Sequence, residues 1–257
     1  MMMFMYLLAG LCGGVLTGMA GLTAAMVVTP ILCGVCGWAG YDATTISLIA
    51  NIPAAMVTCY TYYKNGNVDL QRTKSVVGSA FIGAVVGSWL GYLFSQVSES
   101  GVSYAVIIMN LFLAVKYIKP AKAKEDSLTE QKQQKQQKKT LLAIALAFVI
   151  GMECGFMGSA GGALMLMVVT IVLGMDTKLA VGTNSMIMAL VALTGAVSHV
   201  AMGAQVELIP GIVVTVVCTA AAVVSARFAN KVSERVLNVS TGFVLIAVSL
   251  LSLILGA

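Results

Sequence analysis

The chain has 257 residues, of which 59% are hydrophobic and only 10% are charged, and its formal net charge is +5. Soluble domains carry about 25% charged residues, so this composition excludes a soluble enzyme or a nucleic-acid-binding domain. Apolar runs recur along nearly the whole chain, and a membrane-spanning helix needs about 20 such residues. We therefore expect an all-α polytopic membrane protein whose basic residues reflect its topology in the bilayer.

The first apolar run, residues 4–36, predicts a broken helix. A continuous helix of that length would be about 50 Å long, whereas the hydrocarbon core is about 30 Å thick. The expected break is at 18–25, because its glycines let the backbone leave helical geometry without a steric cost. The two pieces form either a re-entrant hairpin or two short spans. Gly18 and Gly21 are the candidate substrate-binding residues of this break.

No Lys or Arg precedes the first apolar run, so we interpret it as part of the first helix and not as a cleavable signal peptide. Three further helices are expected at 43–63, 75–94 and 102–115. The next segment, 116–139, contains eight lysines and is too polar to bury, which is typical of a solvated cytoplasmic linker. The resulting division is a first membrane repeat at 1–115, the linker at 116–139 and a second membrane repeat at 140–257.

The second half of the chain repeats the first at a constant spacing of 137 residues. The glycine pairs in this register are Gly14 with Gly151, Gly18 with Gly155, Gly21 with Gly158, Gly37 with Gly174, and Gly66 with Gly203. Repetition at a fixed spacing is the sign of a duplicated architecture. We therefore expect the second half to have a broken element at 151–162, a helix that ends near a glycine loop, and two more helices at 208–230 and 236–255.

The positions of the basic residues predict that the repeats are inverted, because Lys and Arg concentrate in cytoplasmic loops. With the linker inside and inverted repeats, all fifteen basic residues are cytoplasmic. Parallel repeats would instead move Lys178, Arg227, Lys231 and Arg235 outside. We therefore expect two inverted repeats, each with a broken or re-entrant first element and three transmembrane helices, eight to ten membrane segments in all. Both termini are then outside, and the discontinuous helices meet near the midplane.

The stretch 151–162 contains five glycines and one carboxylate inside an apolar run. If a helix starts again near Ser159, its first N–H groups lack intrahelical partners and carry the positive end of the helix dipole. Such an end attracts an anion. The candidate substrate-binding residues of this element are Gly158, Ser159, Gly161 and Gly162.

Short polar side chains cluster in the helix that follows each broken element. They are suited to donating hydrogen bonds to anion oxygens, although capping and helix–helix hydrogen bonding explain them almost as well. Asn51 and Pro53 lie in the middle of the predicted helix 43–63, and Pro53 leaves a carbonyl one turn back without its hydrogen bond. One interpretation is a local kink that faces the substrate. The candidate residues are Thr44, Thr45, Ser47, Asn51, Thr183, Asn184 and Ser185.

Glu153 is the acidic residue that lies well inside an apolar run, where a charge is costly and commonly serves an ion or proton pathway. Burial disfavours its charged form, and a bound anion beside it would do the same. We therefore expect Glu153 to couple transport to protons; the alternative is a hydrogen-bonded structural glutamate near the cytoplasmic interface. For His199, near the outer end of its helix, we expect an interfacial hydrogen bond.

No reactive-site pattern suggests an enzyme. The sequence shows no Ser/His/Asp set, phosphate loop or nucleotide fingerprint, and its six cysteines and sixteen methionines are scattered as apolar packing residues. We expect no cofactor, no bound metal and no disulfide.

Several short motifs together resemble the TauE/SafE family of membrane anion exporters. They are Gly155-x-x-Gly158-x-Ala-Gly161-Gly162, Ala180-Val-Gly-Thr-Asn-Ser185, Gly18-x-x-Gly21, Pro30 and Asn65-Gly-Asn-Val-Asp69. The resemblance covers both halves and implies transport of sulfite, organosulfonates or other small carboxylates, usually outward. Where the family tends to have a run of glycines, this chain has Leu-Thr-Ala-Ala at 22–25. The first break is then tighter, or its substrate contact comes from Thr23.

The functional expectation is a secondary transporter in the cytoplasmic membrane that exports a small anion by alternating access with proton coupling. The alternative is an anion channel or a non-transporting accessory subunit. The expected partners are the small anion and the lipid bilayer, with no nucleic acid, and homo-oligomerisation stays open.

Overall fold

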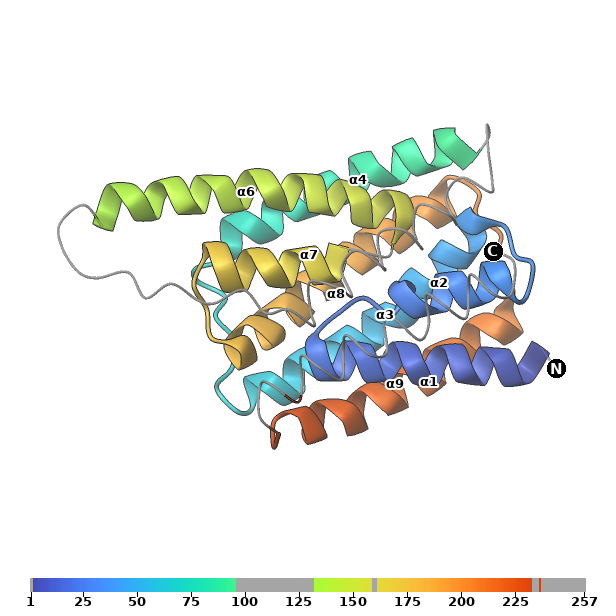
Figure 1. Cartoon of the computed structure of the whole chain (residues 1–257). Coiled ribbons are helices and arrows are strands. Elements are labelled where there is room, and N and C mark those ends of the chain that lie inside the picture. The colour runs from blue at the N-terminus through green and yellow to red at the C-terminus, as the bar shows by residue number, and fades with distance from the viewer. Residues whose placement is uncertain (1, 96–131, 159–160, 233–235, 237–257) are drawn as a thin grey trace.

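The computed structural model describes residues 2–95, 132–158, 161–232 and 236, and this part of the chain is all helical (Figure 1). Within the described residues, six helices are long and apolar enough to cross a membrane. They are α1 (Met2–Ala20), α3 (Gly40–Tyr63), α4 (Lys74–Ser95), α6 (Lys132–Met157), α8 (Thr177–Ala201) and α9 (Leu208–Ala229). The prediction of an all-α polytopic membrane protein is confirmed at this level.

Two shorter apolar helices complete the described part. They are α2 (Ala25–Gly34) and α7 (Gly161–Met167), and α7 continues as the π-helical turn η1 (Val168–Val172). The predicted helix at 102–115, and that at 236–255 apart from Val236, lie outside the described residues. Helix α6 starts at Lys132, inside the segment predicted as the linker, and its apolar part begins at Lys139.

Both predicted helix breaks are present. Helix α1 ends at Ala20 and α2 begins at Ala25, so the first break is at 21–24. Helix α6 ends at Met157 and α7 begins at Gly161, so the second break starts at Gly158 and the first glycines of the stretch 151–162 lie inside α6. Each break begins with a glycine of positive φ, 64° at Gly21 and 70° at Gly158. Side chains other than glycine rarely adopt this backbone conformation.

The 137-residue spacing seen in the sequence reappears in the backbone. The other glycines of positive φ in the described residues are Gly37 (71°) with Gly174 (68°), and Gly66 (73°) with Gly203 (98°). Each pair is separated by the same spacing as Gly21 and Gly158. The two halves of the chain therefore leave helical geometry at equivalent places.

Helices of the first half pack against helices of the second half. Helix α1 of the first half lies along α9 of the second, α4 of the first lies along α6 of the second, and α3 packs against α8 between them (Figure 1). Glycines make the outer two contacts close, which is how membrane helices without a hydrophobic driving force approach one another. The facing residues are Gly14 with Cys218, Gly18 with Ser225, Gly151 with Ala80, and Gly155 with Ala84.

Helices α3 and α8 are the most buried spans, whereas α4, α6 and α9 expose apolar side chains such as Trp89, Val149 and Ile212. Exposed apolar side chains on the outside of a bundle are what contact with lipid requires. The polar candidates on α3 and α8 are therefore held at the centre of the molecule.

Candidate functional site

The two helix breaks touch each other inside the bundle. Gly162, at the start of α7, lies against Leu22 and Thr23 of the first break, and a Cβ atom at Gly162 would be 2.5 Å from the Thr23 backbone nitrogen. Gly158 lies against Ala25, the first residue of α2, with 3.4 Å between its ideal Cβ position and the Ala25 Cβ. The folding of the chain thus brings together two segments that are remote in the sequence.

Asn184 of α8 joins the two breaks through one side chain. Its Nδ2 group donates to the carbonyl oxygens of Gly21 and Gly162, both at 2.8 Å. Each carbonyl belongs to a different broken element, so this amide fixes the position of one element relative to the other. The Asn184 side chain is fully buried, and its Oδ1 atom has no hydrogen-bond partner among the described residues.

Asn51 of α3 holds the first break from the opposite side. Its Oδ1 atom accepts a hydrogen bond from the backbone N–H of Ala24 at 2.9 Å, and the Thr17 hydroxyl lies 3.4 Å from the same atom. Ala24 directly precedes α2, so Asn51 caps the start of that helix from a neighbouring helix. Asn51 is fully buried, and within the described part of the chain its Nδ2 group has no partner.

The second break is held at the end of α6. The last carbonyls of a helix have no intrahelical partner, and two of them find side chains here. The Thr44 hydroxyl donates to the Met157 oxygen at 3.3 Å, and His199 Nε2 lies 2.7 Å from the Gly155 oxygen. Since a carbonyl only accepts, Nε2 carries the proton in this contact.

His199 is fully buried among the helices of the bundle. Its Nδ1 atom lies 2.9 Å from the Thr45 hydroxyl, and its ring stacks on Tyr41 with 4.2 Å between ring centroids. Sequence reasoning missed its part in the break. The available signal was a polar ring in an apolar helix, which must find a partner when buried.

Glu153 is half-buried near the end of α6, beside the second break. A Cβ atom at Gly161 would lie 2.9 Å from the Glu153 Oε2 atom, and the Cys154 sulfur packs against the same glycine. The carboxyl group therefore lies next to the first residue of α7.

Some candidate residues lie away from the point where the breaks meet. Gly18 is inside α1 and packs against Ser225 of α9. Ser47 bonds within its own helix and accepts a hydrogen bond from Thr29 of α2 at 2.9 Å. Ser185 bonds to the Val181 oxygen of its own helix, although its hydroxyl also lies beside Gly21. Ser159 lies outside the described residues.

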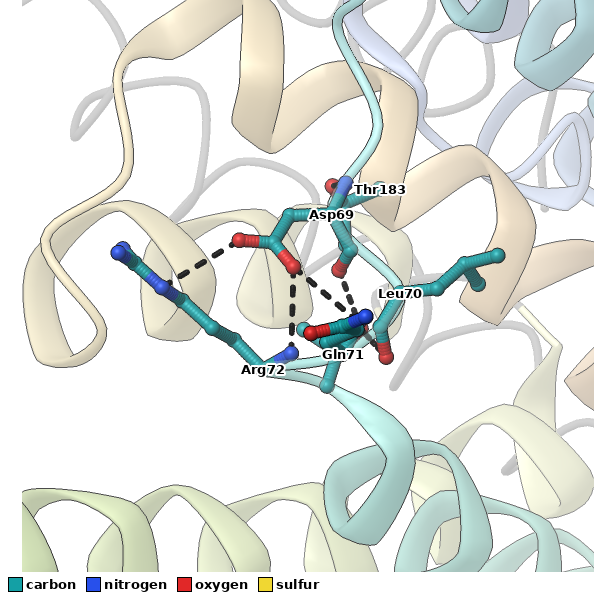
Figure 2. A network of polar contacts seen from close by, with 6 residues as sticks. Asp69, Leu70, Gln71, Arg72 and Thr183 are labelled. Atoms are coloured by element: carbon teal, nitrogen blue, oxygen red, sulfur yellow. Dashed lines mark hydrogen bonds and ion pairs between the residues drawn. The ribbon is translucent and has the colours of Figure 1, made fainter.

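Thr183 holds the loop that follows α3 (Figure 2). Its hydroxyl accepts the backbone N–H of Asp69 at 3.0 Å, and the Asp69 carboxylate pairs with Arg72 Nε at 3.3 Å. The loop after α8 is held in a similar way, because the N–H of Gln205 donates to Asp42 Oδ1 on α3 at 2.7 Å. Each half therefore fixes a loop of the other, and Thr183 serves that contact.

Among the described residues, no cluster of three or more His, Cys, Asp or Glu side chains could hold a metal ion. None of the six cysteines forms a disulfide there.

Two discontinuous helices that meet inside a polytopic bundle define the arrangement in which membrane transporters place a substrate site. The model of the family described as Sulfite exporter TauE/SafE matches residues 6–252, nearly the whole chain, and the protein belongs to this family. The family is one of transporters and not of enzymes, which confirms the expectation from sequence.

A curated relative is the "Probable membrane transporter protein YunE" of Bacillus subtilis (strain 168), which is 27% identical over 165 residues. The match covers 61% of this chain and 60% of that protein, so the chain spans less than two thirds of the relative's length. No solved structure matches the chain.

Proposed function

We propose that the protein is a secondary transporter that moves a small anion, such as sulfite, an organosulfonate or a small carboxylate, outward across the cytoplasmic membrane. The observation that carries this proposal is the junction at Asn184, which bonds to Gly21 of one broken element and to Gly162 of the other. A substrate bound at this junction contacts both halves of the chain at once. A movement of one half relative to the other then changes the side from which the junction is reached.

The start of α2 is the part of the junction suited to an anion. The N-terminal end of a helix carries partial positive charge, and here it is buried beside the Nδ2 group of Asn51, which has no partner among the described residues. The N–H groups of Ala24, Met26 and Val27 are already bonded within the protein, so the helix contributes its dipole and Asn51 contributes the donor. Both are neutral, and they replace part of the hydration of an anion without a buried counter-charge. This favours an anion over a cation as substrate.

Inverted repeats are part of the same proposal, with the linker cytoplasmic and both termini outside. The distribution of Lys and Arg supports this orientation. The contacts of α1 with α9 and of α6 with α4 support a two-fold relation between the halves, because such a relation would produce this pair of contacts. In this arrangement a rigid-body movement of the halves gives alternating access.

We also propose that Glu153 couples transport to protons. The carboxyl lies beside Gly161 at the second break, so an anion held at the junction would disfavour its ionised form. Proton and anion then bind together and leave together, which is a reciprocal coupling between two sites.

The test is flux in proteoliposomes that contain the purified protein. A panel of sulfite, sulfonates, thiosulfate and small carboxylates is loaded on one side, with protein-free liposomes as the control. A transporter gives flux that saturates with substrate and responds to a pH gradient. Flux without saturation or coupling would instead indicate a channel, and no flux for any anion would indicate an accessory subunit.

A further inference from the structure

The two buried amides at the junction have orientations that their neighbours determine. Asn51 meets the backbone N–H of Ala24, which can only donate, so the atom turned toward it must be the acceptor Oδ1. Asn184 meets the carbonyls of Gly21 and Gly162, which can only accept, so the group turned toward them must be Nδ2. Exchanging the oxygen and nitrogen of either amide would place like groups against each other.

With these orientations, one hydrogen-bond donor and one acceptor of the two amides are not used by the protein contacts described above. Asn51 keeps its Nδ2 group, and Asn184 keeps its Oδ1 atom because both of its N–H bonds are used. Both side chains are fully buried, and in the described part of the chain neither leftover group has a partner. Buried polar groups are almost always hydrogen-bonded, and an exception calls for a ligand or water.

Both leftover groups border the first break. The Asn51 amide is bonded to Ala24 at one end of the segment 21–24, and the Asn184 amide is bonded to Gly21 at its other end. The donor lies at the start of α2, a helix of ten residues, where an anionic oxygen is favoured. The acceptor belongs to an amide whose nitrogen is bonded to two backbone carbonyls, and an acceptor is matched by a donor and not by a second anionic oxygen.

We propose that the substrate is a small oxyanion that also carries an O–H or N–H donor near its charged group. Its anionic oxygen accepts from Asn51 Nδ2, and its own donor bonds to Asn184 Oδ1. Two sources supply this chemistry: an oxyanion that keeps one acidic proton, such as hydrogen sulfite, or a hydroxy- or amino-substituted sulfonate or carboxylate. This inference rests on the proposed function and narrows its substrate class.

An anion without a donor would fit less well. It would leave the Asn184 acceptor buried and unpaired, or would have to retain a water molecule there. Sites built to bond a substrate O–H or N–H reject analogues that lack it for this reason. A substrate gives up hydrogen bonds to water when it enters the junction, so it binds there without loss only if it makes both of these hydrogen bonds.

The first test uses the unaltered protein in proteoliposomes and pairs of anions of equal charge and similar size. The pairs are 2-hydroxyethanesulfonate with ethanesulfonate, and 2-hydroxypropionate with propionate. The member that carries the hydroxyl should bind about 5- to 150-fold more tightly in competition assays, the range that corresponds to one unpaired buried polar group. Sulfite is then compared at pH values where it is mainly singly or mainly doubly ionised, which separates an acidic proton from a carbon-borne donor as the source.

The second test is Asn51→Asp, which keeps the oxygen that accepts from Ala24 and replaces only the leftover donor. The new carboxylate is compatible with the start of α2, so the thermal midpoint should stay within a few degrees of the parent's. Anion binding should weaken at least about tenfold, because a donor to the substrate becomes an acceptor of like charge. The matched control is Ser88→Ala, which removes another buried polar group without a partner among the described residues, from α4, and should leave binding unchanged.

The outcomes separate the inference from the proposed function. Equal affinity for both members of each pair, or unchanged binding by a stable Asn51→Asp variant, would overturn the inference while anion transport stands. If no anion of the panel is transported, the proposed function and the inference fail together. A variant that does not fold leaves the anion pairs on the unaltered protein to decide.

Discussion

The two breaks are held by side chains at opposite ends of a helix. At the first break, Asn51 accepts a hydrogen bond from the backbone N–H of Ala24, the residue that directly precedes α2. At the second break, Thr44 and His199 form hydrogen bonds to carbonyl oxygens at the end of α6. The backbones of the two breaks begin in nearly the same way, with φ of 64° and 70° at their first glycines. Two breaks of similar backbone conformation thus have two different sets of side-chain contacts.

This difference separates two kinds of chemistry. The contacts of the first break are neutral, so the break offers donors that do not change with pH. The second break has the carboxyl group of Glu153 and the imidazole of His199 beside it. We infer that the first break recognises the anion and the second responds to protons, and Asn184 connects the two.

The largest expected effect is that of Asn184→Ala. The substitution leaves the carbonyls of Gly21 and Gly162 without their buried donors, at about 1–3 kcal/mol for each. We expect a strongly lowered thermal midpoint in detergent and loss of transport. Thr194→Val on the same helix is the control, because within the described part of the chain that hydroxyl bonds to Leu190 of its own helix alone. Similar midpoints for the two variants would show that the junction does not stabilise the fold.

The next effect compares glycines inside and outside the breaks. Gly21→Ala and Gly158→Ala each combine a positive φ with a contact of 2.7 Å from the new Cβ atom to a neighbouring helix. At Gly37 and Gly174 the φ is also positive but nothing lies within 4 Å. Alanine at the latter two should cost about 1–2 kcal/mol from φ alone, and at the breaks about 1–3 kcal/mol more from overpacking.

Thermal unfolding of the four variants measures this difference. Equal losses at all four glycines would mean that the packing of the breaks contributes nothing beyond their backbone conformation.

The breaks could be predicted from the sequence because a backbone of positive φ requires glycine, so each break shows as a glycine within an apolar run. The constant spacing of the glycine pairs predicted that positive φ recurs at equivalent positions of the two halves, which the backbone confirms. Glycine does not distinguish its uses, however. Gly18 has the same appearance in the sequence as Gly21, yet it packs α1 against α9, because a missing side chain serves close helix approach as well as a turn.

The partners of the polar residues were not accessible in this way. The contact from Asn184 to Gly21 joins residues 163 positions apart, and no local pattern states which loop a buried amide faces. The hydrogen bond from the Asp69 backbone to Thr183 could not be predicted for the same reason. Short polar side chains in a membrane helix therefore predict a buried contact, but only the packing of the two halves decides whether that contact is to substrate or to backbone.

A smaller effect on the fold is expected from Glu153→Gln, which keeps the shape of the side chain and removes its titration. The variant should fold normally and exchange anions between equal pools, but net transport should no longer follow an imposed pH gradient. Glu207→Gln is the control, since Glu207 is exposed and directly precedes α9. If net transport by the Glu153 variant follows the gradient as in the parent, the second break does not couple protons.

The smallest effect on stability and transport is expected from single cysteines that report on sidedness. Gly66→Cys and Gly203→Cys, placed in a background without the native cysteines, occupy equivalent turns, both exposed and both with no atom within 4 Å of the new Cβ position. Any strain from positive φ is therefore similar in the two variants.

Inverted repeats place the turn at Gly66 inside and the turn at Gly203 outside, because the basic residues lie near the former. An impermeant thiol reagent added to intact cells should label only the cysteine at 203, while permeabilised cells should show both. Equal labelling of the two positions in intact cells, whether of both or of neither, would mean that the halves are parallel, and the two breaks would then enter the membrane from the same side.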